Sequence, residues 1–406
     1  MPSNDRASAE VPAGARFSIS GDELGAGSAR RFYLPELDVL RFFAFLAVFL
    51  QHAFQKTPAY YFPETHRSLS GRAVSILAWS GGYGVDLFFV LSAFLITQLL
   101  MREQAATGTL DVRRFYIRRI LRIWPLYFAY LILIAVIGIR IAQVNVAAKW
   151  LILFALLSGN IANALWGWTP TFIASHLWSI AVEEQFYLLW PLVVRGRRPR
   201  SLVAAAFVMI AISVIARTIC WLASAPGSFV WTNTLTRLDP LAGGILLGVS
   251  TMGKPFRPRA LARISLLIFG VATMLVVSAF CDPYWSPNSA RTLFFGYPAV
   301  TVGCVSILAA FLGLKLNATS LMTCAGVYLG KISYGLYIWH MVALELAVKA
   351  LARPIPFAGD WVESSAFVAF CALGLTIAIS AASYRLLETP FLRLKSRFAL
   401  IPSRPA

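Results

Sequence analysis

Residues 37–54 read LDVLRFFAFLAVFLQHAF, a run of eighteen residues that is apolar except at four positions. Coiled into a helix, this run is about 27 Å long, which is close to the thickness of the hydrocarbon core of a bilayer. The rest of the chain has the same character, because 58% of its 406 residues are hydrophobic and only 13% are charged. A soluble domain of this size is far more polar. We therefore predict an all-α fold, a polytopic transmembrane helical bundle that forms a single membrane domain.

Basic loops test how many of the eleven apolar runs cross the membrane, because short loops rich in Lys and Arg stay cytoplasmic. One such loop, 113–122, follows the second run, and another, 195–200, follows the fifth. Three runs lie between them, so one of the three does not span. The weakest is 149–165, where polar and small residues interrupt the pattern, and we expect a re-entrant or interfacial helix there. The eleven runs are 37–54, 82–101, 121–139, 149–165, 177–194, 201–223, 235–251, 263–280, 293–313, 331–351 and 364–386.

About ten spans then remain, and this even number puts both termini in the cytoplasm. Residues 1–32 are polar and rich in Ala, Ser and Gly, so we expect a disordered cytoplasmic tail without a signal peptide,. The membrane domain then covers 33–395, and residues 396–406 form a short cytoplasmic tail.

The formal charge of +18 raises the question of nucleic-acid binding,. The positive charges cluster in short loops between apolar runs, and no basic stripe with interleaved aromatic residues is present, so we expect membrane lipids as neighbours and no nucleic acid. The five cysteines are scattered without CxxC spacing, and no metal site is indicated,.

Polar residues inside the first run are the first candidates for function. Asp38 and Arg41 lie at its cytoplasmic end and His52 near its outer end. Eleven residues separate Arg41 from His52, which is three helical turns plus roughly 20°, so the two side chains share one face about 16 Å apart. Buried charges of this kind normally serve a function. The alternative is that Arg41 and His52 extend to the inner and outer headgroups.

A second set of polar residues lies in SHLWSIAVEEQFYLLWP, residues 175–191. His176, Glu183 and Tyr187 are seven and four residues apart and share a helix face, whereas Glu184 points elsewhere. A carboxylate in the membrane needs a compensating partner, and a histidine could supply one, which suggests chemistry at this face. A purely structural ion pair is the alternative.

The segment RRFYIRRILRIWP, residues 113–125, places Arg119 and Arg122 one turn apart at the cytoplasmic entrance of a span. Paired guanidinium groups suit the recognition of phosphate. They are equally consistent with charges that only set the topology by facing lipid headgroups.

Three weaker candidates come from other spans. Arg237 and Asp239 lie near the outer end of one span, and His340 lies in the middle of another, where a lone histidine is as often a helix-to-helix hydrogen-bonding group as a functional one,. Arg385 and Glu388 are three residues apart and are expected to pair with each other. Ser333 and Tyr334 join His340 as candidates for substrate or structural support.

Seven motifs together resemble the acyltransferase family 3 membrane proteins, in the order in which that family has them. The resemblance covers roughly 33 to 395, and Ala93 replaces the glycine that the family usually has in the second motif. The motifs are LDVLRFFAFLAVFLQHAF, GGYGVDLFFVLSAFLI, FYIRRILRIWPLY, HLWSIAVEEQFYLLWP, TRLDPLAGGILLG, ISYGLYIWH and SYRLLETPF.

This resemblance implies O-acylation of a carbohydrate hydroxyl in a surface polysaccharide, exopolysaccharide or lipid-linked glycan, at the bacterial inner membrane. The donor would be cytoplasmic acyl-CoA, with acetyl-CoA favoured, and no permanently bound cofactor is expected. The family's basic residue and histidine in the first helix match Arg41 and His52, its RxxR motif matches Arg119 and Arg122, and its acidic residue after WS matches Glu183.

A mechanism follows as an expectation. Arg119 and Arg122, with Arg41, would hold the phosphates of acyl-CoA, and His52 would act at the outer end as a general base or as a transient acyl carrier. Either Glu183 or His176 would orient His52. The rival function is a transporter or flippase for a lipid or glycan, because buried charges also line transport paths. The arginine pair favours the enzyme. The oligomeric state is open.

Overall fold

The computed structural model describes residues 32–56, 69–140, 146–253, 256–281, 288–351 and 361–401. The tail predicted for residues 1–32 lies outside these ranges except for its last residue, and so does the end of the chain after residue 401. Every regular element within the described ranges is helical, as the apolar periodicity predicted. The main helices are α1 (Pro35–Gln55), α3 (Leu69–Ser80), α4 (Gly84–Thr107), α5 (Val112–Arg140), α6 (Ala148–Ala155), α7 (Gly159–Trp166), α8 (Leu177–Val194), α9 (Pro199–Leu222), α10 (Gly227–Thr232), α11 (Leu238–Ser250), α12 (Ala260–Phe280), α13 (Tyr297–Phe311), α14 (Leu321–Lys331), α15 (Ser333–Leu351), α16 (Trp361–Ser383) and α17 (Thr389–Ser396).

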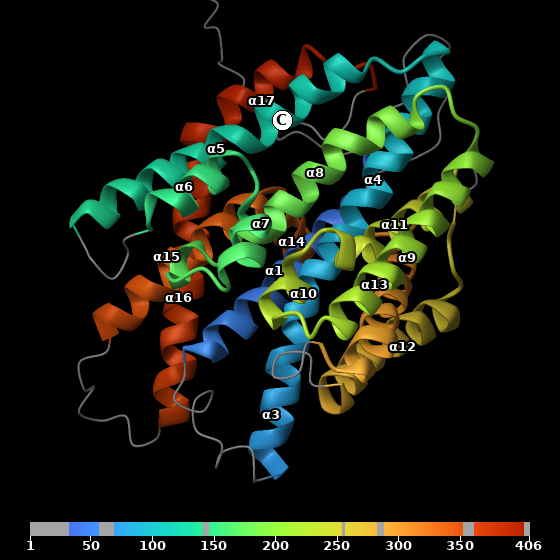
Figure 1. The fold of residues 1–406 in the computed structure, drawn as a ribbon. Helices are drawn as coiled ribbons and strands as arrows, with labels where there is room; N and C mark the ends of the chain where they lie inside the picture. Colours follow the sequence, from blue (N-terminus) through green and yellow to red (C-terminus); the bar gives the residue numbers. More distant parts are fainter. Residues whose placement is uncertain are drawn as a thin grey trace, which may run out of the picture.

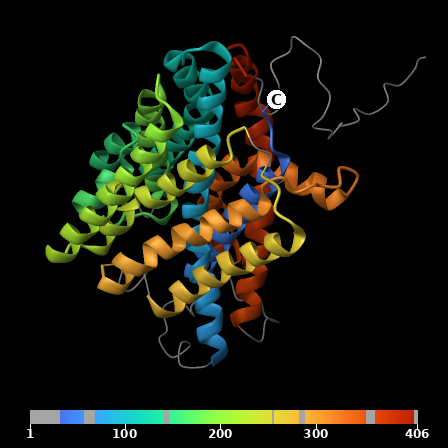
Figure 2. The ribbon, with the colours of Figure 1, turned by 90° about the vertical axis from the view of Figure 1, so that its right-hand side faces the viewer.

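The helices α1 and α4 run through the middle of the bundle. Figure 1 shows α9, α11 and α13 on one side of them and α15 and α16 on the other. Figure 2, turned by 90°, shows the α3–α4 rod extending along the length of the molecule beside α12. Helices from distant parts of the chain therefore meet around α1, and this arrangement brings its polar residues next to those of α8 and α15.

The outer helices present apolar side chains on the surface. In α12 only 11% of the most apolar eighteen-residue window is buried, and in α9 only 22%. Leu261, Phe280 and Leu222 are each exposed by more than 65%. A soluble protein does not leave such surfaces in water, so these faces contact lipid. The chain is a multi-pass membrane protein.

Seven helices within the described ranges are long and apolar enough to cross a bilayer. The helices α8 and α15 have 18 and 19 residues but are more polar, and α11, with 13, is shorter than the run predicted at 235–251. Ten crossings with both termini cytoplasmic therefore stay a prediction.

The segment 149–165 folds as two helices of eight residues each, α6 and α7. Each is about 12 Å long, less than half of the hydrocarbon thickness, so neither crosses the membrane alone. Leu157, with φ of 54°, ends the first helix, and Gly159 begins the second. This geometry agrees with the expectation that no continuous span exists here.

Small residues allow α1 to approach its neighbours closely. A Cβ added at Gly84 would overlap the carbonyl oxygen of Ala44, and one added at Gly330 would overlap that of Asp38. The position at which the chain departs from the family, Ala93, is fully buried beside Gly244 of α11. The glycine on the neighbouring helix leaves room for the extra methyl group.

The expectation that Arg385 and Glu388 pair with each other is wrong. Both lie in a π-helical turn, Tyr384–Glu388. The wider π-turn separates residues that are three apart, which an α-helix would place on one face. Arg385 is exposed, whereas Glu388 is buried and only 6% exposed.

Candidate active site

Three of the chain's four histidines lie together although they come from three different helices. His52 is near the end of α1, His176 caps the start of α8, and His340 is in the middle of α15. The rings of His52 and His340 have centroids 5.1 Å apart, and those of His176 and His340 are 5.2 Å apart. His66 lies outside the described residues. The structure thus brings all three predicted histidines to one place.

A direct hydrogen bond links two of these histidines. His52 Nδ1 lies 2.9 Å from His340 Nε2, and His340 Nδ1 lies 2.6 Å from the carbonyl oxygen of Tyr337. His340 is fully buried, whereas His52 is partly accessible. Because the ring nitrogens of His52 and His340 point at each other, no space for a metal ion lies between them. The described residues contain no group of three or more side chains arranged to hold a metal.

The outer rim of this cluster carries charge and aromatic surface. Lys56, one turn after His52, forms an ion pair of 2.7 Å with Glu345 and lies 3.8 Å above the ring of Phe172. The ring of Phe172 also meets that of His52 edge-on at 6.3 Å. Charged and aromatic side chains therefore border His52 on this side of the cluster.

A cavity lined by cations lies toward the other end of α1. This entrance cavity, of about 720 Å³ with its mouth, is lined by Arg41, Arg119, Arg122 and Lys395. Among the described residues, no carboxylate lies within ion-pairing distance of any of these four groups. Glu183 acts on Arg41 and Arg119, and Glu388 acts on Arg122, only from beyond ion-pairing distance. Positive charge is therefore in excess at this cavity, and the cavity favours an anion from outside.

Asp38 also lines the entrance cavity, but its carboxylate does not pair with any of the four cations. It accepts a hydrogen bond of 2.8 Å from the hydroxyl of Tyr33. Arg118 contrasts with its neighbour Arg119, because it is buried and paired with Glu103 at 2.6 Å. Arg118 is therefore a structural arginine, whereas Arg119 and Arg122, which form the RxxR motif, line the cavity.

A second, central cavity continues from the entrance cavity toward the histidines. The two share Arg41, Ser92, Arg119, Arg122 and Tyr187 in their walls. The two spaces adjoin at these five side chains, and we call the pair of adjoining cavities the passage. The far end of the central cavity is formed by Ser179 and Tyr337, and Ser333 and Tyr334 also line it.

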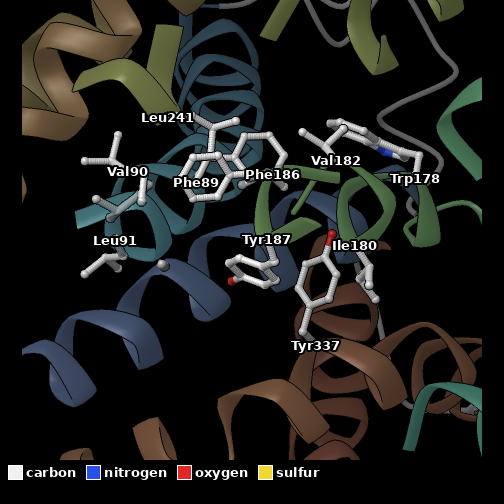
Figure 3. Packing of buried hydrophobic residues seen from close by; sticks show 14 of the residues in the cluster. Phe89, Val90, Leu91, Trp178, Ile180, Val182, Phe186, Tyr187, Leu241 and Tyr337 are labelled. Carbon is white, nitrogen blue, oxygen red and sulfur yellow. The ribbon is translucent and has the colours of Figure 1, made fainter. Parts of the chain in front are cut away.

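Tyr337 separates the passage from the histidine cluster. Its hydroxyl lies 2.6 Å from Ser179 Oγ, and its ring centroid lies 5.4 Å from that of His176 and 5.5 Å from that of His340. Figure 3 shows Tyr337 next to Tyr187, close to the packed side chains of α4 and α8. One aromatic ring therefore stands between the cavity and the histidines.

Glu183 lies in the central cavity and not beside His52. Ser92 donates to it at 2.8 Å and the hydroxyl of Tyr187 at 3.2 Å. Glu183 is two helical turns beyond His176 on α8, about 10 Å along the axis. The hydrogen-bond partner of His52 is His340, so of the two residues expected to orient His52, Glu183 is placed elsewhere. His176 is close but makes no hydrogen bond to His52 among the described residues.

The helices α1 and α8 both run between the cation-lined cavity and the histidine cluster, in opposite chain directions. Arg41 and His52 are eleven residues apart on α1, and Tyr187 and His176 are eleven residues apart on α8. Both pairs run from the cation cavity to the histidine cluster, about 16 Å along each axis. The helical phase predicted for each helix therefore holds in the packed bundle.

Arg237 and Asp239 belong to a separate, buried charge cluster. Arg237 forms two hydrogen bonds of 2.7 and 2.8 Å with Asp86, and Asp239 pairs with Arg217 at 2.7 Å. The ring of Tyr297 lies 4.9 Å from the guanidinium of Arg237. Each of the four charges is paired within the protein, although several of their polar atoms have no hydrogen-bond partner among the described residues. The pairing favours structural support over substrate contact.

Sequence reasoning missed several residues of the passage. Lys395 lies between Arg393 and Arg397 in a basic segment near the end of the chain, and its spacing does not distinguish it from charges that set topology. Tyr337 and Ser179 stand in the quoted motifs but carry no pattern that predicts contact between them. The partners Asp86 and Arg217 lie within apolar runs, and their isolation there was the available signal.

Comparison with known proteins adds to this geometry. The profile of the acyltransferase domain of acyltransferase family 3 matches residues 34–385. The O-acetyltransferase OatA of Staphylococcus aureus is 28% identical over 92% of this chain and 59% of its own length. A putative O-acetyltransferase of Staphylococcus aureus strain COL is 27% identical over 88% of this chain and 57% of its own length. The chain thus spans about three fifths of these relatives. No solved structure matches.

Proposed function

The chain belongs to acyltransferase family 3, and from that premise we propose that it is a membrane-bound O-acetyltransferase of the bacterial inner membrane. It would take an acetyl group from cytoplasmic acetyl-CoA and transfer it to a hydroxyl of a surface carbohydrate or its lipid-linked precursor. The names of its relatives support the acetyl group and the oxygen acceptor for those proteins.

One observation carries the proposal: two adjoining cavities lead from a cluster of four cations to Tyr337, and the ring of Tyr337 contacts His176 and His340, of which His340 is hydrogen-bonded to His52. A transferase that joins a cytoplasmic donor to an outer acceptor needs both ends and a route between them. The cations would hold the charged part of the donor, and the histidines would supply the proton chemistry.

The donor fits the cation end by charge and by shape. Coenzyme A carries phosphate groups, and guanidinium groups bind phosphate through two parallel hydrogen bonds. Arg119 is held by the rings of Phe115 and Tyr187, each 5.3 Å from its guanidinium carbon. Arg119 also lines both cavities, where its N–H groups would meet the donor. The narrow pantetheine arm would follow the passage toward Tyr337.

The acetyl transfer would proceed by attack of the acceptor oxygen on the thioester, coupled to removal of the hydroxyl proton. The acceptor hydroxyl gives its proton to His52, and its oxygen attacks the thioester carbonyl. The C–S bond breaks as the C–O bond forms, and the leaving thiolate becomes free coenzyme A by taking up the proton that His52 received, which restores neutral His52. In a covalent route, a ring nitrogen of His52 would attack the thioester carbonyl, the C–S bond would break and coenzyme A would leave. The acceptor hydroxyl would then take the acetyl group from His52, which breaks the C–N bond and frees the ring.

The test compares surface glycans by mass spectrometry. Three strains are needed: one with the wild-type chain, one without it, and one with His52→Ala at equal protein level. We expect an ester-linked acetyl group on the glycan in the first strain alone. Acetylated glycan in the His52→Ala strain would contradict the proposed role of His52, and glycans that lack any acyl difference while their export changes would favour a transporter.

A further inference from the structure

The histidine cluster contains a directed chain of three groups. It runs from the backbone carbonyl of Tyr337 to His340 Nδ1 at 2.6 Å, through the ring of His340, and from its Nε2 to His52 Nδ1 at 2.9 Å. The centroids of the two rings are 5.1 Å apart while their nearest nitrogens are 2.9 Å apart. The rings therefore meet edge to edge, which is the geometry of an N–H···N hydrogen bond.

The first link decides the position of one proton. A carbonyl oxygen only accepts hydrogen bonds, so the hydrogen between Tyr337 and His340 belongs to His340 Nδ1. In a neutral imidazole the other nitrogen then carries the lone pair, and His340 Nε2 is an acceptor.

The second link follows from the first. Because His340 Nε2 accepts, His52 Nδ1 must donate, and His52 Nε2 is left with its lone pair free. A second proton on His340 would reverse this direction, but it would put a positive charge on a ring that is fully buried. No carboxylate hydrogen-bonds to His340 among the described residues, so nothing would compensate that charge.

We propose that His340 is the positioning residue of the transfer reaction: through the Tyr337 carbonyl it holds His52 in the Nδ1–H tautomer and thereby directs the basic Nε2 of His52 to the acceptor. The catalytic consequence of this inference rests on the proposed function. The tautomers that it assigns to His52 and His340 do not depend on any activity.

Packing holds His340 in this orientation. The ring of Phe45 meets it edge-on at 5.9 Å, with planes 83° apart, and the ring of Tyr337 lies 5.5 Å away. A ring held on two sides and hydrogen-bonded at both nitrogens has no alternative rotamer of similar energy. His52 is thus oriented by a fixed neighbour while its own Nε2 faces the partly open side.

His176 has a different place in the cluster. Its ring lies 5.2 Å from that of His340 with planes 70° apart, and among the described residues neither of its nitrogens has a hydrogen-bond partner. It makes no hydrogen bond to His52 among the described residues and therefore does not set the tautomer of His52.

When His52 accepts the proton of the acceptor hydroxyl, it becomes a cation with hydrogens on both nitrogens. Its Nδ1–H bond to His340 then becomes charge-assisted and strengthens. The interaction is thus stronger in the transition state than before it, which is the condition for raising the rate of the chemical step. Loss of the acceptor at His340 should lower kcat and leave the KM for acetyl-CoA unchanged.

The first experiment measures the tautomers directly. ¹⁵N solid-state NMR of the wild-type protein in lipid nanodiscs resolves protonated from unprotonated ring nitrogens, and the chain has only four histidines to assign. We expect Nδ1–H on both His52 and His340. A hydrogen on His52 Nε2 of the neutral protein would overturn the proposal, whether or not the protein transfers acetyl groups.

The second experiment uses two amide variants that differ in where their oxygen lies. The amide oxygen of His340→Gln reaches the region of Nε2 and can still accept from His52, whereas that of His340→Asn ends nearer the position of Nδ1. We expect His340→Asn to lower kcat by about 100-fold and His340→Gln to restore much of this loss, with the same KM for acetyl-CoA in both.

Equal loss in the two variants, or an effect on KM alone, would overturn the positioning role. Binding of acetyl-CoA to each variant serves as the control for folding. If the wild-type protein shows the expected tautomers but transfers no acetyl group, the proposed function fails and the tautomer assignment stands.

Discussion

Replacing Arg119 by alanine should weaken acetyl-CoA binding by about 10- to 150-fold. One hydrogen-bonded contact between a guanidinium and an anion contributes about 1.5 to 3 kcal/mol, and this range converts to that change in Kd. Arg119 contacts no carboxylate among the described residues. Glu183 and Glu184 act on it only from beyond ion-pairing distance, so its N–H groups remain available to the donor.

The same substitution should change the free energy of unfolding little. Loss of the two aromatic contacts, with Phe115 and Tyr187, costs about 0.5 to 1 kcal/mol each,. Removal of one of four mutually repelling cations offsets part of this cost. We expect a net change within about 1 kcal/mol, small beside the effect on binding.

Isothermal titration of the detergent-solubilised protein with acetyl-CoA measures the effect. Arg113→Ala is the matched control, because Arg113 belongs to the same basic segment but is exposed and does not line either cavity. It removes the same net charge. Equal affinity of the two variants would show that Arg119 only sets the topology and would refute the assignment of this cavity to the donor.

Further predictions concern the fourth cation and the packing. Lys395→Ala should weaken acetyl-CoA binding about fivefold, less than Arg119→Ala, because an ammonium lacks the two-pronged geometry of guanidinium; equal losses in titration would contradict this. Gly330→Ala should lower the free energy of unfolding by about 1 to 3 kcal/mol, because its Cβ overlaps the backbone of α1,. Thermal denaturation checks this against Gly374→Ala, whose Cβ meets no atom within 4 Å. Asp86→Ala should cost about 3 to 5 kcal/mol by leaving Arg237 unpaired, and a normal melting temperature would refute that.

Periodicity predicted what lies along a single helix. The shared face of Arg41 and His52 follows from their spacing, and α1 keeps that face in the packed bundle. The absence of a continuous span at 149–165 could also be predicted from the sequence, because the small and polar residues there cannot continue an apolar span. Both results depend on residues that are near one another in sequence.

Contacts between different helices could not be predicted from residue spacing along one helix. His52 and His340 are 288 residues apart, and no spacing rule relates residues on different helices, so the sequence suggested Glu183 or His176 as the partner of His52. The π-turn that separates Arg385 from Glu388 likewise depends on packing, because the residues themselves are compatible with an ordinary helix.

The sidedness of the reaction tests the central claim, a route from a cytoplasmic donor to an outer acceptor. Sealed membrane vesicles from glycan-producing cells can be prepared inverted or right-side-out and given radiolabelled acetyl-CoA from outside. We expect label in the glycan of inverted vesicles alone, and none with His52→Ala. Equal labelling in both orientations, or unchanged labelling with His52→Ala, would contradict the account.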